Sequence, residues 1–108
     1  MRQTVNWGLL EIEYNEKNVK RLFNNMESLE INAERGCSTS ASIKVDLENA
    51  LYLNPSLSDN ERGAIIGILI KQLSQTEHGQ ATGISQRMGS HYVKQGIKKT
   101  VAFLNGGK

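Results

Sequence analysis

The sequence of 108 residues has few of the groups with which small proteins replace a large core or hold a metal. Its only cysteine is Cys37, which excludes an internal disulfide framework and a cysteine-based zinc site within one chain. No histidine or second cysteine lies near Cys37 in the sequence to activate its thiol, so a catalytic cysteine is not expected. Aromatic residues make up only 6% of the chain, so the core must rest mainly on Leu, Ile, Val, Ala and Met.

A long apolar run is also missing. The longest apolar cluster, Ala64–Ile70, is far too short to span a bilayer, and the N-terminus has no stretch that resembles a signal peptide. We therefore expect no membrane partner and a cytoplasmic location. Charged residues make up 22%, close to the value for ordinary globular domains, and the length suits one domain rather than two.

Acidic residues are almost absent from the C-terminal part of the chain. Residues 1–62 contain seven Lys or Arg and ten Asp or Glu, whereas residues 63–108 contain six Lys or Arg and one acid, Glu77. A surface that binds nucleic-acid phosphates requires such a basic excess. A solvated basic face without a partner explains the charge equally well, because short-range clustering of charge is common.

Apolar residues recur at helical spacing along most of the chain, which predicts an all-α fold. Asn15–Glu34 carries one apolar stripe and is expected to form one helix, whose stripe packs inside the domain or forms a seam between two copies. A second helix is expected from about Ser40 to the break before Pro55. A third is expected over Asp59–Leu73, preceded by Ser58 as the first residue of a capping box, S-x-x-E.

The first fourteen residues and two glycines are less regular. Residues 1–14 contain an alternation that fits a short strand, but Trp7 and Leu10 also fit one turn of helix. Gly63 and Gly67 lie four residues apart in an expected helix, where each costs about 1 kcal/mol relative to alanine. Their presence predicts that a neighbouring helix approaches closely.

Leu73–Lys99 is the stretch most informative about function. It predicts two short helices joined by a turn, with Ser74 capping the first, Gly83 taking a left-handed conformation and Ser85 capping the second. The second helix, Gln86–Gln95, carries only basic charges and continues into a basic tail helix. This is the layout of a helix-turn-helix, whose second helix enters the major groove of DNA.

The side chains expected to contact DNA carry basic and hydrogen-bonding groups. Arg and Lys donate to guanine or phosphate, Gln pairs with adenine, and Ser is flexible in what it binds. The candidate DNA-binding residues are Gln75, Thr76, Ser85, Gln86, Arg87, Ser90, His91, Lys94, Lys98 and Lys99, with Lys71 also near the DNA backbone. The two histidines, His78 and His91, have no Cys or carboxylate pattern between them, so neither a metal nor another cofactor is expected.

Four short motifs follow one another without gaps in the C-terminal half. They are Leu57-Ser58-Asp59-Asn60-Glu61-Arg62, Leu73-Ser74-Gln75-Thr76-Glu77, Gly83-Ile84-Ser85 and Gly96-Ile97-Lys98-Lys99. With them, residues 57–104 resemble region 4 of bacterial sigma factors and related phage regulators of the ArpU and RinA kind. The resemblance implies a helix-turn-helix DNA-binding part over residues 57–108. Residues 1–56 would then form a helical dimerisation or partner surface within one compact domain.

Three positions depart from the pattern of that family. Its members usually have hydrophobic residues where this chain has His78, Thr82 and Gly89. Losing a buried side chain of leucine size costs several kcal/mol. Either the helices pack unusually closely or the motif is partly decayed, and Met88 and Tyr92 would supply some of the missing apolar area.

Two functions of different classes follow from these patterns. The first is a sequence-specific transcriptional regulator, encoded by a phage or other mobile element, that binds double-stranded DNA. A homodimer reading two half-sites is expected, with Asn15–Glu34 as the dimer surface. The alternative is a sigma-like interaction module that binds RNA polymerase or a host regulator without reading DNA. An enzyme is not expected, because no paired carboxylates, phosphate loop or activated nucleophile are found.

Overall fold

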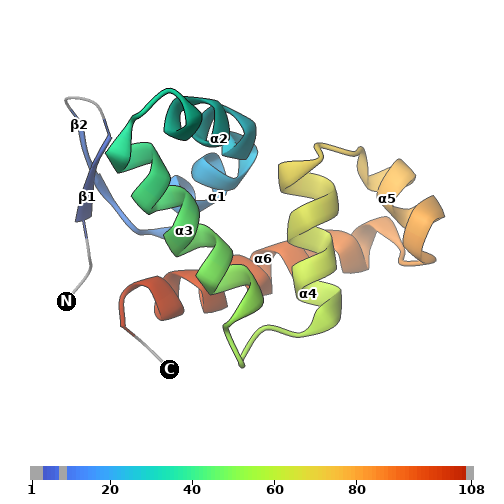
Figure 1. Cartoon of the computed structure of the whole chain (residues 1–108). Helices are drawn as coiled ribbons and strands as arrows, with labels where there is room; N and C mark the ends of the chain where they lie inside the picture. Colours follow the sequence, from blue (N-terminus) through green and yellow to red (C-terminus); the bar gives the residue numbers. More distant parts are fainter. Residues whose placement is uncertain (1–3, 8–9, 107–108) are drawn as a thin grey trace.

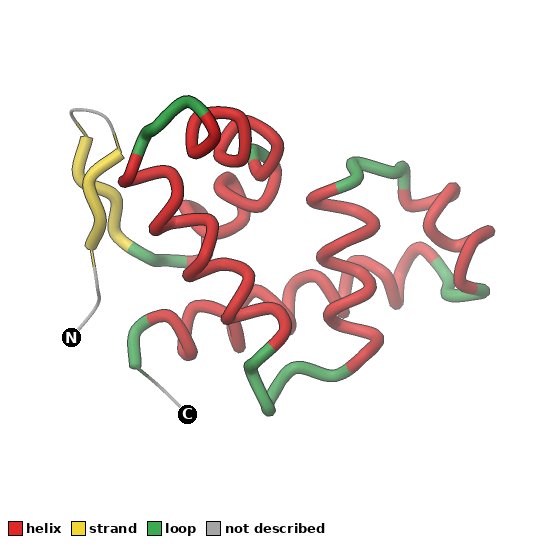
Figure 2. The backbone as a smooth tube through the Cα atoms, in the orientation of Figure 1, coloured by secondary structure: helices red, strands yellow, loops and turns green. Residues whose placement is uncertain are grey.

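The computed structural model describes residues 4–7 and 10–106, which form a mostly helical domain (Figure 1). The chain begins with an antiparallel hairpin, in which β1 (Thr4–Trp7) pairs with β2 (Leu10–Glu13). The helices that follow are α1 (Glu16–Asn24), α2 (Met26–Glu34), α3 (Ser38–Tyr52), α4 (Asp59–Ala64), the wider π-type helix η1 (Ile65–Ile70), α5 (Gln75–Thr82) and α6 (Gln86–Leu104). The mostly helical class is thus confirmed, and residues 4–7 and 10–13 form strands rather than a helical turn (Figure 2).

Helix α6 connects the two parts of the chain. In Figure 1 it runs across the lower half of the view, with α3 crossing it toward one end and α4 and η1 crossing it toward the other. It contacts α1, α3, α4, η1 and α5, and it buries Val93, Ile97 and Leu104 against them. Its side chains join one hydrophobic core to which residues of both expected parts, 1–56 and 57–108, contribute.

The helix expected over Asn15–Glu34 is two helices, α1 and α2, separated at Asn25. The backbone there has φ −109° and ψ 20°, and the Asn25 side-chain Nδ2 donates to the Arg21 carbonyl at 2.8 Å. Asparagine side chains compete in this way with regular helix hydrogen bonds, so the expectation of a single helix was wrong. The apolar stripe, which includes Val19 and Phe23, both fully buried, packs inside the chain's own core.

A buried tyrosine ties the hairpin to the helical part. Tyr14 follows β2 and is fully buried, and its hydroxyl donates to Oδ2 of Asp46 on α3 at 2.9 Å. Burial, followed by the hydrogen bond and the negative charge of Asp46, raises the pKa of Tyr14 far above its ordinary value. The carbonyl of Tyr14 also accepts from Nδ2 of Asn105, just beyond α6, at 3.0 Å. Segments from both ends of the chain are therefore held together.

The capping box expected before α4 is present. The Ser58 hydroxyl accepts from the Glu61 amide at 3.2 Å, and Oε1 of Glu61 accepts from the Ser58 amide at 2.9 Å. Helix α4 continues directly into η1, and the helical segment ends at Ile70, three residues earlier than expected. Gln72 there has φ 56°, and its side-chain Nε2 donates to the carbonyl of Asn24 at 2.9 Å. A left-handed residue ends a helix, so this contact with α1 fixes the exit from η1.

Candidate nucleic-acid interface

Helices α5 and α6 are joined by a short turn whose local contacts follow from the sequence. Ser74 and Glu77 form a capping box at the start of α5, with 3.0 Å in both directions. Gly83 ends α5 with φ 76°, the left-handed conformation that glycine adopts without steric cost. The Ser85 hydroxyl then accepts from the Met88 amide at 3.2 Å and caps α6. All three expected roles, of Ser74, Gly83 and Ser85, are confirmed.

The turn leaves no room for a side chain at Gly79. A Cβ built there would lie 2.7 Å from the carbonyl oxygen of Ile84. A small residue is required here, because the close neighbour of position 79 is the backbone of the turn. Thr82 strengthens the same turn, because its hydroxyl donates to the carbonyl of His78 at 2.8 Å and accepts from the Ile84 amide at 3.3 Å.

His78 is the buried residue at the centre of this unit. It is 3% exposed, and its imidazole packs against Gly67 of η1 and Gly89 of α6. A Cβ on Gly67 of η1 would lie 2.5 Å from Nδ1, and a Cβ on Gly89 of α6 would lie 3.7 Å from Cδ2. Helix η1 therefore packs unusually closely on His78 at Gly67, as in the first of the two alternatives left open by the sequence, whereas the distance at Gly89 is an ordinary contact. Gly63, by contrast, faces open space, so close approach explains Gly67 alone.

Most of the candidate DNA-binding side chains lie at the surface. The exposed candidates are Thr76, Ser85, Gln86, Arg87, Ser90, His91, Lys94, Lys98 and also Lys71. The Gln75 side chain lies outside the part that the structure describes. Helix α6 contains no acid, and it is one unbroken helix of 19 residues, so the reading segment and the basic tail expected separately are continuous.

The starts of α5 and α6 meet at the end of this surface. Nε2 of Gln86 donates to Oγ1 of Thr76 at 3.1 Å, so the first turns of both helices lie side by side. Helix N-termini carry a partial positive charge and free amide groups, both of which favour a phosphate. The start of α6 therefore adds favourable potential to the basic charge of that helix, whereas Glu77 offsets this effect at the start of α5.

Lys99 differs from the other candidates because it is already paired inside the protein. Its Nζ lies 2.8 Å from Oε1 of Glu61, whose side chain is 6% exposed. Burial raises the pKa of the Glu61 carboxyl, but the hydrogen bonds from Lys99 and from the Ser58 amide outweigh it and hold the pKa below its ordinary value. The backbone of Lys99 also accepts a hydrogen bond from Nδ2 of Asn54 at 3.1 Å. Lys99 therefore holds α6 against α4 and is less available to DNA than Lys98.

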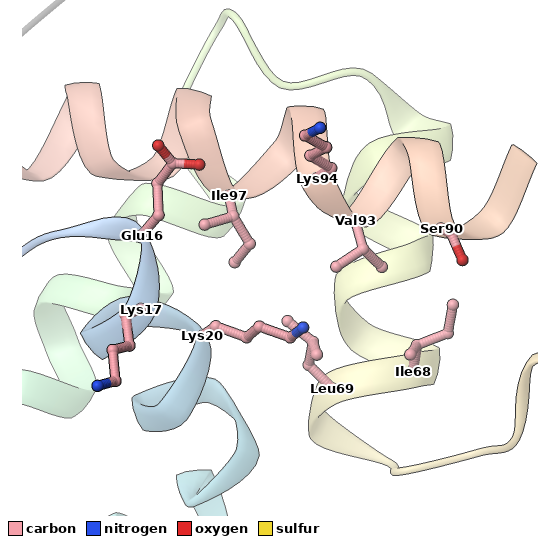
Figure 3. A pocket seen from close by; sticks show the side chains of 9 residues that line it. All are labelled: Glu16, Lys17, Lys20, Ile68, Leu69, Ser90, Val93, Lys94 and Ile97. Carbon is pink, nitrogen blue, oxygen red and sulfur yellow. The ribbon is translucent and has the colours of Figure 1, made fainter.

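Two lysines that the sequence did not single out lie close to the candidate surface. Lys17 and Lys20 on α1 line a pocket together with Ser90 and Lys94 of α6 (Figure 3). They are separated from α6 by more than sixty residues of sequence, so no local pattern links them to it. Only the packing of α1 against α6 places them there.

No protein family, curated protein or solved structure matches this chain. Among the residues that the structure describes, no group of three or more His, Cys, Asp or Glu side chains could hold a metal ion. No helix within the described ranges is both long and apolar enough to cross a bilayer.

Proposed function

We propose that this protein is a sequence-specific DNA-binding regulator in which α5 and α6 act as a helix-turn-helix. The observation that carries the proposal is the outer face of α6, which is exposed and free of acids and directly follows a short, well-capped turn. In proteins of this class the first turns of the second helix reach base edges in the major groove. Arg87, Ser90, His91 and Lys94 are the residues in that position here.

The roles of these side chains follow from their chemistry and spacing. Arg87, His91, Lys94 and Lys98 succeed one another at three- or four-residue intervals, so they share one face of α6. The arginine is suited to paired donation to guanine, whereas lysines make point contacts with phosphate. Lys98, more than ten residues from the start of α6, would contact the DNA backbone. Gln86 would lie at the groove edge with its amide oriented by Thr76.

We also propose that residues 57–104 are related to sigma region 4 and to phage regulators, and that the protein is encoded by a mobile element. Recognition of two half-sites by a homodimer is also part of the proposal, because one such motif rarely gives high specificity. The apolar stripe of α1 and α2 is buried in the chain's own core, so it is not the surface on which two copies would meet. A dimer would have to use another face.

Selection of bound fragments from a random duplex pool, followed by titration across a salt series, tests the proposal. We expect a defined motif and a logarithmic salt slope that becomes shallower by about one for each phosphate contact removed. Arg87→Ala with Lys94→Ala should weaken binding at least tenfold. Arg35→Ala with Lys44→Ala removes the same charge from the α2 and α3 region and serves as the matched control.

The outcomes distinguish sequence-specific DNA binding from binding of another protein by the same fold. Absence of binding to any duplex, or affinity that does not depend on salt, would show that the proposal is wrong. Full affinity of the Arg87 and Lys94 variant would exclude the outer face of α6 as the reading surface. In that case an interaction with RNA polymerase or another protein becomes the better explanation of the fold.

A further inference from the structure

A pocket of about 420 Å³ opens between α1, η1 and α6, beside the outer face of α6 (Figure 3). Its size falls within the range of about 300–1,000 Å³ that is typical of small-molecule sites. The lining residues are Glu16, Lys17, Lys20, Ile68, Leu69, Ser90, Val93, Lys94 and Ile97. The walls are aliphatic, and the charged groups stand around the opening.

The deeper wall is built by core residues. Leu69, Val93 and Ile97 are at most 8% exposed, and Ile68 is half-buried beside them. In Figure 3 the side chain of Lys20 extends across this wall toward Leu69. A lysine stem covers apolar surface well while its ammonium group stays in water. Lys20 therefore shields the wall, and moving its stem aside would uncover aliphatic surface.

The charge around the opening is unbalanced. Three lysines and one acid, Glu16, line the pocket, and none of these lysines forms an ion pair with another of the described residues. Figure 3 shows Lys17 and Lys94 directed away from the wall, whereas the side chain of Lys20 extends along it. An ammonium group at the edge of apolar surface can form a charge-assisted hydrogen bond with an anionic partner. An aliphatic wall next to an unpaired ammonium suits an amphipathic anion.

We propose that this pocket binds a small organic carboxylate with an aliphatic body. The aliphatic body would lie against Leu69, Val93 and Ile97, which bury it from water. Its carboxylate would accept hydrogen bonds from Lys20 and from the Ser90 hydroxyl at the rim. A phosphate of DNA has the same negative charge but no apolar group to bury against the aliphatic wall. The small carboxylate therefore fits the lining better. This site does not depend on DNA binding by α6.

Titration of the full chain with octanoate, followed by NMR of its methyl groups, tests the site. We expect saturable shifts at Leu69, Val93 and Ile97, and much weaker binding of octanamide, which has the same shape without the charge. Lys20→Met keeps most of the apolar stem and removes the ammonium, so it should weaken octanoate binding at least tenfold. Lys44→Met on α3, outside the pocket lining, is the control and should leave the affinity unchanged.

Each alternative result overturns the proposal. Octanamide binding as tightly as octanoate would show that the lysine does not recognise an anion there. The absence of saturable shifts up to millimolar octanoate would leave the pocket without a carboxylate ligand. If Lys20→Met lowers affinity for duplex DNA and leaves octanoate binding intact, Lys20 contacts a DNA phosphate and the assignment is wrong. A thermal melt of Lys20→Met separates these results from unfolding, which an exposed substitution should not cause.

Discussion

The imidazole of His78 lies so close to the Cα of Gly67 that a Cβ on Gly67 would be 2.5 Å from Nδ1. Real Cβ atoms do not approach other heavy atoms to this distance, so any larger residue at position 67 must displace the ring. His78 is 3% exposed, and its Nε2 has no hydrogen-bond partner among the described residues. Shape rather than polar contact therefore holds this histidine between η1 and α6.

Gly67→Ala is expected to destabilise the protein by about 1 to 3 kcal/mol, the usual cost of overpacking a close contact. Gly63→Ala, four residues earlier, meets nothing within 4 Å and should instead stabilise it by up to about 1 kcal/mol through helix propensity. Urea unfolding of the two variants measures both effects. Adding His78→Ala to Gly67→Ala should remove the penalty of the new methyl group. A penalty that persists in the double variant would place the clash elsewhere.

Stability should fall in acid partly through Glu61. Its pKa is lowered in the folded protein, so its contribution is complete above the ordinary value of 4.5 and is lost as pH falls through the folded pKa. Glu61→Gln should cost about 2 kcal/mol near neutral pH and make the acid limb of the stability curve shallower. Lys99→Met removes a hydrogen bond that lowers this pKa, so it should also make the acid limb shallower. Thermal melts between pH 2 and about pH 7 measure both changes.

An unchanged acid limb in both variants would contradict this role of Glu61. The carboxylate also closes the capping box through the Ser58 amide, so its loss weakens the start of α4 as well as the pair with Lys99. Ser58→Ala removes part of the cap without touching the pair. It should lower stability by about 1 kcal/mol while leaving the ion pair in place.

Gly83→Ala should destabilise the α5–α6 turn by about 1 to 2 kcal/mol, because alanine at φ 76° brings Cβ close to the backbone. Nothing lies within 4 Å of a Cβ there, so the cost comes from the backbone alone. Asparagine tolerates the left-handed region better than alanine, and Gly83→Asn should therefore lose less. Equal losses for the two variants, measured by urea unfolding, would indicate a steric cause instead.

Octanoate and duplex DNA should exclude one another if both proposals hold. Ser90 and Lys94 line the pocket and also belong to the outer face of α6, so one ligand removes contacts from the other. Once the octanoate concentration exceeds the dissociation constant of octanoate, the apparent dissociation constant for DNA should rise in proportion to that concentration. Fluorescence anisotropy of labelled duplex measures this, and Lys20→Met should reduce the effect. Unchanged DNA affinity at saturating octanoate would show that the two surfaces are separate.

Sequence reasoning succeeded where structure depends on near neighbours. The caps at Ser58, Ser74 and Ser85 and the left-handed Gly83 are each fixed by residues within a few positions, and all four are present. Serine at such a position supplies the side-chain acceptor that the start of a helix needs, and glycine allows the left-handed backbone that ends one. The exposure of Arg87 and its neighbours on α6 follows from helical periodicity in the same way.

The features that sequence reasoning missed depend on packing between distant segments. The sequence predicts a close approach at Gly67, but the partner, His78 on α5, lies eleven residues away and no local pattern pairs the two. Lys99 appears basic and exposed in the sequence, yet it pairs with Glu61 across the interface of α6 and α4. The break at Asn25 was hidden because the apolar stripe continues across it from α1 to α2.

Because α6 is unbroken over 19 residues, it can act as a mechanical lever. At about 1.5 Å per residue it is about 28 Å long, and a tilt of about 5° about its C-terminal end would move its first turn by about 2 Å. Its last turns are held near Tyr14 through Asn105, whereas Arg87 lies at the far end. Substitutions in the hairpin or at the C-terminal end of α6 would therefore shift the position of Arg87, although they lie at the opposite end of the helix.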